Sequence, residues 1–171
     1  MSTFVTRTQA LTTPAENFAA TIRELRDRAE VVDALHRFAQ GQDLRDRDLF
    51  ASSFTGDATL DFRPTAAKWG AEPPVLVGRE GIADAIFGLF AGRVDTTHRV
   101  TNTRVSIDGD TAHCTALVEA QHLLTIDHTV HALLNNYYDT TLHRTGDHWR
   151  IHHLRIDNVW LTGTPKAIFD A

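Results

Sequence analysis

The chain has 171 residues, enough for one domain whose core needs neither a disulfide nor a metal. Hydrophobic residues make up 42% of it and charged residues 23%, which is ordinary for a globular protein. The net charge of −5, with acidic and basic residues well mixed, argues against a surface for nucleic acid or anionic membranes. The single cysteine, Cys114, excludes an internal disulfide and a cysteine-rich zinc site.

The amino-terminal region carries no recognisable targeting signal. It lacks the continuous apolar segment of a signal peptide, and no apolar run in the chain approaches the roughly 20 residues that span a bilayer. We therefore expect a cytoplasmic protein with no membrane partner. Residues 1–14 are expected to form a flexible segment and residues 15–171 a single domain.

The first half of the chain predicts helices. Thr13, Pro14 and Glu16 have the spacing of a helix start with a capping box. A second start signal at Asp27 precedes an apolar face at helical spacing, and Gly41 is a natural stop. Beyond this point we expect a short helix at 44–54, a strand at 57–62, a proline-rich loop at 63–77 and a helix at 78–93.

The second half predicts a sheet of four strands in meander order. The turns "DGD" (108–110) and "TGD" (145–147) contain glycine, which supplies the positive φ that tight hairpins need. The strands are expected near 96–107, 111–126, 129–143 and 148–161. Helices followed by an antiparallel sheet predict the α+β class.

Alternation along the two middle strands predicts which face is buried. Even-numbered residues at 112–124 and 130–142 are mostly apolar and should face the core, with His122, Asn136 and Tyr138 as polar exceptions and Tyr137 pointing outward. Such a wall is typical of a small-molecule cavity, and equally of a core with satisfied polar groups. On the odd-numbered face, three leucines would be left wet, which favours a homo-oligomer, a dimer or trimer: Leu117, Leu123 and Leu133.

Several motifs together resemble one family. They are "GQD" (41–43), "GREGI" (78–82), "TTHRVTNTRVSIDGDTA" (96–112) and "YYDTTLHRTGDHWRIHHLRIDNVW" (137–160). In this order they resemble the SnoaL-like branch of the nuclear transport factor 2-like superfamily, over about residues 22–163. The resemblance implies a cone-shaped, strongly curved sheet wrapped by amino-terminal helices, with a cavity between them.

The same resemblance implies a catalytic pair. In dehydratase-like members the cavity holds a histidine and an aspartate, which correspond here to His98 and Asp43. A histidine titrates near neutrality and can take and return a proton, while a carboxylate bonded to one ring nitrogen fixes its tautomer. The expected function is a cofactor-independent lyase or isomerase acting on an apolar oxygenated small molecule such as a polyketide, steroid or terpenoid. No cofactor is expected, since neither a P-loop nor a G-x-G-x-x-G motif is present.

Further residues are predicted to contact the substrate. Phe38 stands where related dehydratases carry a tyrosine, and Trp69 is a candidate lid. Arg155 corresponds to a cavity arginine only if a one-residue bulge brings it inward, because Leu154 occupies the matching position. The full set of expected substrate contacts is His122, Asn136, Tyr138, Arg155, Phe38, Trp69, Val118, Ala120 and Leu134.

Alternatives remain open at this point. The pair of His98 and Asp43 is also compatible with a non-catalytic small-molecule-binding or oligomerisation module of the same fold, or with a polyketide cyclase. Ten histidines invite a metal site, but strand neighbours such as His152 and His153 point to opposite faces. No metal is expected.

Overall fold

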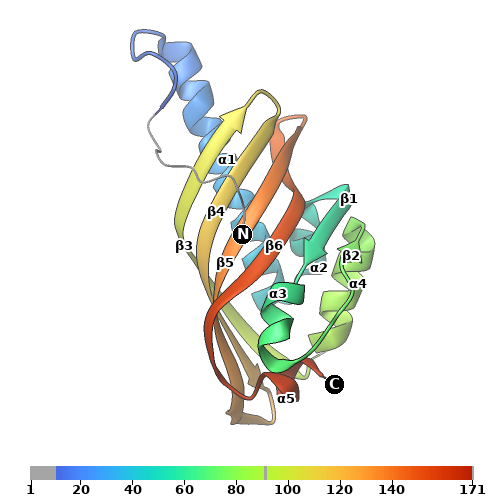
Figure 1. Cartoon of the computed structure of the whole chain (residues 1–171). Helices are drawn as coiled ribbons and strands as arrows, with labels where there is room; N and C mark the ends of the chain where they lie inside the picture. The colour runs from blue at the N-terminus through green and yellow to red at the C-terminus, as the bar shows by residue number, and fades with distance from the viewer. Residues whose placement is uncertain (1–10, 91, 171) are drawn as a thin grey trace.

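The computed structural model describes residues 11–90 and 92–170, which form an α+β fold around one curved, six-stranded sheet (Figure 1). The helices are α1 (Phe18–Asp43), α2 (Arg47–Ser52), α3 (Arg63–Ala66), α4 (Arg79–Phe90) and α5 (Pro165–Phe169), with a 3₁₀ turn at Ala67–Trp69. The strands are β1 (Phe54–Asp61), β2 (Leu76–Val77), β3 (Val94–Asp108), β4 (Thr111–Leu124), β5 (Asp127–Thr145) and β6 (His148–Gly163). The predicted fold class is confirmed.

The sheet has the order β2-β1-β6-β5-β4-β3 and is not closed. Its long strands, β3 to β6, form the predicted antiparallel meander, while β1 runs parallel to β6 and antiparallel to β2. In Figure 1, α1 crosses behind this sheet, and α3, β2 and α4 lie beside β1. The helices therefore cover one face of the sheet.

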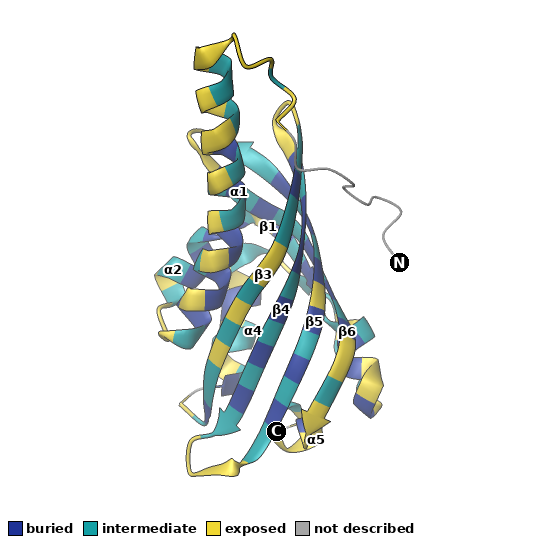
Figure 2. Ribbon diagram, turned by 90° about the vertical axis from the view of Figure 1, so that its left-hand side faces the viewer, coloured by how far each residue is buried: buried dark blue, intermediate teal, exposed yellow. Residues whose placement is uncertain are grey.

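Burial alternates along the middle strands as predicted. In β4 and β5 the even-numbered residues are largely buried and the odd-numbered ones more open, a pattern that Figure 2 shows as alternating colours. Tyr137 is exposed, as expected. Three outer-face leucines are partly exposed on the odd-numbered side, and assembly through this face stays a prediction: Leu117, Leu123 and Leu133.

Helix α1 is longer than the sequence signals indicate. It begins after Asn17, whose side chain accepts a hydrogen bond from the Ala20 amide, rather than at the predicted Thr13. Asp27 does not start a new helix. It lies inside α1, where its carboxylate accepts hydrogen bonds from Arg144 and from the Trp149 indole. Asp27 therefore makes tertiary contacts instead of capping a helix.

Gly41 does not end the helix either. A Cβ at this position would collide with the backbone of Phe50, so the glycine lets the last turn of α1 pack directly against α2. The corner between these two helices then fixes where Asp43 points. The remaining predicted elements, 44–54, 57–62 and 78–93, correspond to α2, β1 and α4.

The predicted amino-terminal segment, residues 1–14, is described only from residue 11 onward. Residues 1–10 lie outside the described residues. The backbone amides of Thr12 and Thr13 donate to the Glu24 carboxylate of α1 at 2.9–3.1 Å.

The prediction that residues 63–77 contain no helix or strand is wrong. Pro64 lies in the first turn of α3, where its missing amide hydrogen costs nothing, and β2 pairs with β1 at the end of the segment. Between them, Pro73 and Pro74 run without regular structure. None of the described helices is long and apolar enough to cross a membrane.

Candidate active site

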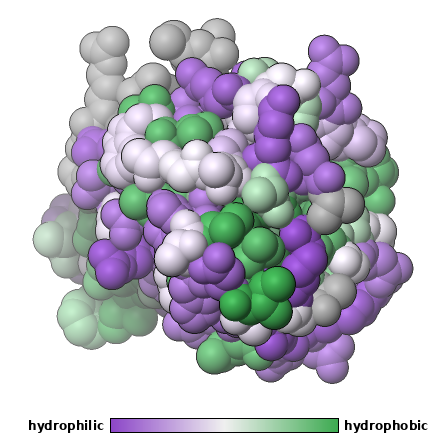
Figure 3. All heavy atoms as spheres, turned by 90° about the horizontal axis from the view of Figure 1, so that it is seen from below, coloured by the Kyte–Doolittle hydropathy of each residue, from purple (hydrophilic) through white to green (hydrophobic). Residues whose placement is uncertain are grey.

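A cavity of about 380 Å³ lies between the inner face of the sheet, the end of α1 and helix α4. Its volume is within the range of small-molecule sites. Apolar side chains dominate its lining, and five polar residues interrupt them: Gln42, His98, His122, Asn136 and Tyr138. Pro73, Pro74 and Leu76 also line it, so the proline-rich segment forms one wall. Seen from below, hydrophobic side chains gather near the middle of this end of the molecule, among hydrophilic ones (Figure 3).

His98 of β3 and Asp43 at the end of α1 are in direct contact, although 55 residues separate them. His98 Nδ1 is 2.6 Å from Asp43 Oδ1, and the His98 backbone amide donates to Asp43 Oδ2 at 2.7 Å. The Thr96 hydroxyl donates to Asp43 Oδ1 at 2.8 Å. Because three donors hold one carboxylate, its position relative to the imidazole is closely defined.

The electrostatics of this pair keep the carboxylate charged. Burial disfavours the Asp43 anion, but the hydrogen bonds and charge interaction with His98, helped by Thr96, outweigh it and hold the Asp43 pKa below its usual value. A charged Asp43 favours the tautomer with the proton on His98 Nδ1. The other ring nitrogen, Nε2, is then free to accept a proton, and the His98 side chain lines the cavity while only 3% exposed.

His122 of β4 is a second imidazole in the same cavity. Its ring centroid is 5.5 Å from that of His98, and it packs between Phe90 and Phe169 at 5.4 and 4.9 Å. Burial, followed by the nearby His98, lowers the His122 pKa to about 3, so the ring is neutral at pH 7. Its Nδ1 has no hydrogen-bond partner within the described part of the chain. A buried, unpaired nitrogen is costly unless a ligand or water pairs with it.

Asn136 and Tyr138 of β5 line the neighbouring wall, and each is 2% exposed. Burial and the charge of Asp43 raise the Tyr138 pKa, so its hydroxyl stays protonated and can donate. Asn158 Nδ2 donates to Asn136 Oδ1 at 2.9 Å. Asn136 can therefore offer its amide hydrogens to a molecule in the cavity. Sequence analysis missed Asn158, because its approach to Asn136 depends on an irregularity in the β5–β6 register.

Three more predicted contacts do line the cavity: Phe38, Ala120 and Leu134. Val118 does not line it, because it is fully buried in the solid core farther along β4. Trp69 is not a lid over the cavity. It lies behind the wall, stacked on Phe169 at 5.2 Å, and its indole nitrogen donates to Asp170.

Arg155 is on the opposite face of the sheet, so its predicted contact with the substrate is wrong. It forms an ion pair with Asp157 at 3.0 Å and lines an outer hollow together with His113 and Asp139. A register shift near His152 puts Ile151 and Leu154 on the inner face, which turns Arg155 outward. The bulge thus removes Arg155 from the cavity instead of restoring it.

Several residues that line the cavity were not predicted as contacts, among them Gln42 and Phe90. Gln42 belongs to the "GQD" motif, but helical spacing alone does not say that it faces a cavity. Among the described residues, no group of three or more His, Cys, Asp or Glu side chains is placed to hold a metal ion.

Comparison with known proteins assigns the family. Residues 23–155 match the model of the SnoaL-like domain. The chain is a member of the SnoaL-like family. No curated protein matches this SnoaL-like chain.

Solved structures similar to this SnoaL-like protein share its fold over most of their length. A proposed aromatic ring hydroxylase from Novosphingobium aromaticivorans is 26% identical, with a TM-score of 0.71 over 82% of this chain and 94% of the other. A proposed scytalone dehydratase from the same organism is 16% identical, with a TM-score of 0.71 over 84% and 91%. A type 2 hexachlorocyclohexane dehydrochlorinase is 20% identical, with a TM-score of 0.71 over 84% and 92%.

Proposed function

We propose that this protein is a cofactor-independent lyase or isomerase in which His98 transfers a proton and Asp43 orients it. The observation that carries the proposal is the carboxylate held by three hydrogen bonds against an imidazole that lines an apolar cavity. Two structural neighbours bear names that denote eliminations, a dehydratase and a dehydrochlorinase. Those names agree with the chemistry that the pair allows.

The reaction begins at His98 Nε2, which takes a proton from a carbon of the bound molecule. The electrons of that C–H bond form a new double bond. In an elimination the neighbouring carbon loses its hydroxyl or halide. A departing hydroxyl takes the proton from His98 to make water, whereas a halide leaves as the anion and His98 then gives its proton to solvent. In an isomerisation the proton returns to another carbon. Asp43 stabilises the imidazolium that exists between the two steps.

The polar side chains around the pair define the kind of substrate. His122 and Tyr138 are uncharged at neutral pH, and Asn136 offers amide hydrogens, so together they suit a neutral oxygen atom rather than an ionised group. The rest of the wall is apolar. We therefore propose an apolar molecule that carries a carbonyl or hydroxyl oxygen, such as a polyketide, steroid or terpenoid.

Deuterium exchange into simple ketones tests the proposal without knowledge of the natural substrate. 2-Tetralone and androst-4-ene-3,17-dione would be incubated with the protein in D₂O, and deuterium beside the carbonyl followed by NMR. His98→Ala and Asp43→Asn should slow the exchange by a factor on the order of 10² or more. His113→Ala is a matched control, because His113 forms a similar pair with Asp139 at 2.5 Å but on the outer face.

Two results would contradict a catalytic role. In the first, the wild type exchanges deuterium into neither ketone faster than His98→Ala does. In the second, His98→Ala keeps the full exchange rate of the wild type. Binding of the ketones with equal affinity to wild type and His98→Ala, without exchange, would instead favour a non-catalytic binding module. Product analysis on a linear polyketide would separate a cyclase from a lyase.

A further inference from the structure

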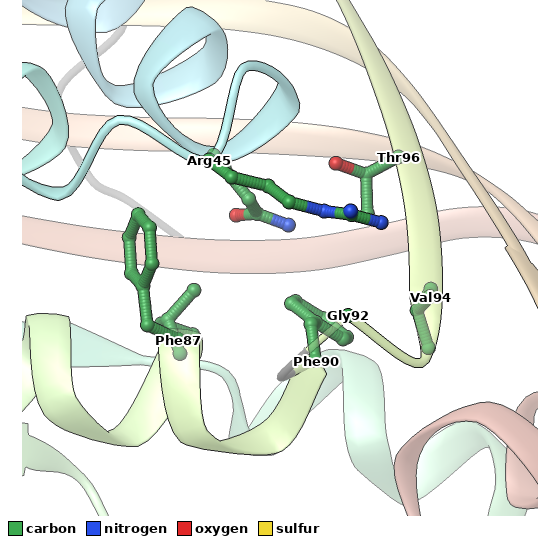
Figure 4. Close-up of a pocket in the computed structure, with 8 residues that line it drawn as sticks. Arg45, Phe87, Phe90, Gly92, Val94 and Thr96 are labelled. Atoms are coloured by element: carbon green, nitrogen blue, oxygen red, sulfur yellow. The ribbon is translucent and has the colours of Figure 1, made fainter. Parts of the chain in front are cut away.

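A second, smaller hollow of about 70 Å³ lies against the main cavity. The side chains of Gln42, Ile86 and Phe90 line both spaces, so they form the wall between them. Figure 4 shows this side pocket, with Phe87 and Phe90 rising from α4 and the Arg45 side chain reaching toward Thr96 of β3. Its volume is sufficient for more than one water molecule.

The side pocket ends beside the catalytic pair. Thr96 lines it and donates to Asp43 Oδ1, the same oxygen that lies 2.6 Å from His98 Nδ1. The Asp43 side chain is 18% exposed, compared with 3% for the His98 side chain. The pair thus lies between the two spaces, with the imidazole in the main cavity and the carboxylate one hydrogen bond from the side pocket.

The polar groups of the side pocket suit water. Gln42 is only 8% exposed, and its carboxamide can donate and accept at the shared wall. The Thr96 hydroxyl has an acceptor lone pair left after it donates to Asp43. The other lining side chains, apart from Arg45, are apolar, which leaves these two groups to hold a water between them.

Arg45 covers the outer side of the pocket with a weak attachment. It projects from the corner between α1 and α2 and forms an ion pair with Asp95 at 2.8 Å. The two side chains are 51% and 40% exposed, and ion pairs this exposed to solvent contribute little stability. The guanidinium can therefore move aside without disturbing the core.

We propose that the side pocket is a water-filled branch of the active site, in which Gln42 and Thr96 hold water and Arg45 covers the mouth. Its use rests on the proposed function. A dehydration leaves an apolar product in the main cavity and releases water, and the branch lets that water leave beside Asp43. It also brings solvent to the Nδ1 side of His98 while the main cavity is full.

Solvent exchange of the His98 Nδ1 proton tests this branch in the resting protein. Protein labelled with ¹⁵N-histidine would be examined by NMR, and the exchange of that proton with water measured in matched variants. Val94 lines the side pocket but not the main cavity, and Leu76 lines the main cavity but not the side pocket. Val94→Phe should slow the exchange about tenfold, Leu76→Phe should change it less than about twofold, and Arg45→Ala should speed it at least about threefold.

Equal slowing by Val94→Phe and Leu76→Phe, or no effect of Arg45→Ala, would overturn the inference. Arg45→Ala changes an exposed side chain, so this part of the test stands even if Val94→Phe fails to fold. Because no turnover is measured, the exchange rates report on the branch even if the ketones show no proton transfer. Failure of the proposed function and failure of this inference are therefore distinguishable.

Discussion

Lowering the pH should destabilise the protein through His122. In the folded state, burial and the neighbouring His98 hold the His122 pKa at about 3, compared with an ordinary value of 6.5. In the unfolded chain, His122 therefore takes up a proton below about pH 6.5. In the folded protein, it stays neutral until about pH 3. The stability that neutral His122 contributes is therefore complete above pH 6.5 and falls as the pH drops toward 3.

The size of the effect can be worked from these two values. Between pH 7 and pH 5 the unfolded imidazole goes from mostly neutral to almost fully protonated, which costs the folded state about 2 kcal/mol of unfolding free energy. His122→Phe removes the titrating group and suits the aromatic surroundings of Phe90 and Phe169. The variant should therefore lose about 2 kcal/mol less than the wild type over this pH range.

Urea unfolding of both proteins at pH 7 and pH 5 measures this difference. Comparison of the two pH-dependent losses cancels the other titrating groups, which wild type and variant share, and it cancels any uniform effect of the substitution on packing. Equal losses in the two proteins would refute the reasoning, because they would mean that the folded state accommodates a charged His122.

Two further predictions concern the helix corner and the outer face. Gly41→Ala should lower the unfolding free energy by about 1–3 kcal/mol and reduce ketone exchange, because its methyl group would displace Phe50 and with it Asp43; Gly88→Ala, with nothing near its added methyl, should be neutral or stabilising in the same urea titration. Light scattering at micromolar concentration should show a dimer or trimer that Leu133→Glu dissociates, whereas a monomeric wild type would contradict assembly through the outer-face leucines.

Much of the fold follows from local sequence patterns that have a direct physical cause. Residues two apart share a face of a strand, so the inner face of β4 and β5 was predictable down to Asn136 and Tyr138. Tight turns need positive φ, so Gly109 and Gly146 marked the turns before β4 and after β5. Helix boundaries were less predictable. A capping pattern at Asp27 was overridden by its bonds to Arg144 and Trp149, which are more than 100 residues away.

The pairing of His98 with Asp43, which we propose to be catalytic, was predictable only through resemblance to a family. Nothing in the spacing of Asp43 and His98 says that they touch, because their contact depends on how the corner after α1 meets β3. The sequence by itself determined the four long strands, the buried face of β4 and β5, and the residues available for chemistry. Only the tertiary structure decided that Arg155 points outward, that Trp69 lies behind the wall and that Gln42 borders two spaces. The reason is geometric: one bulge reverses the face of the residues that follow it until the next bulge, and a wall is formed by elements that only packing brings together.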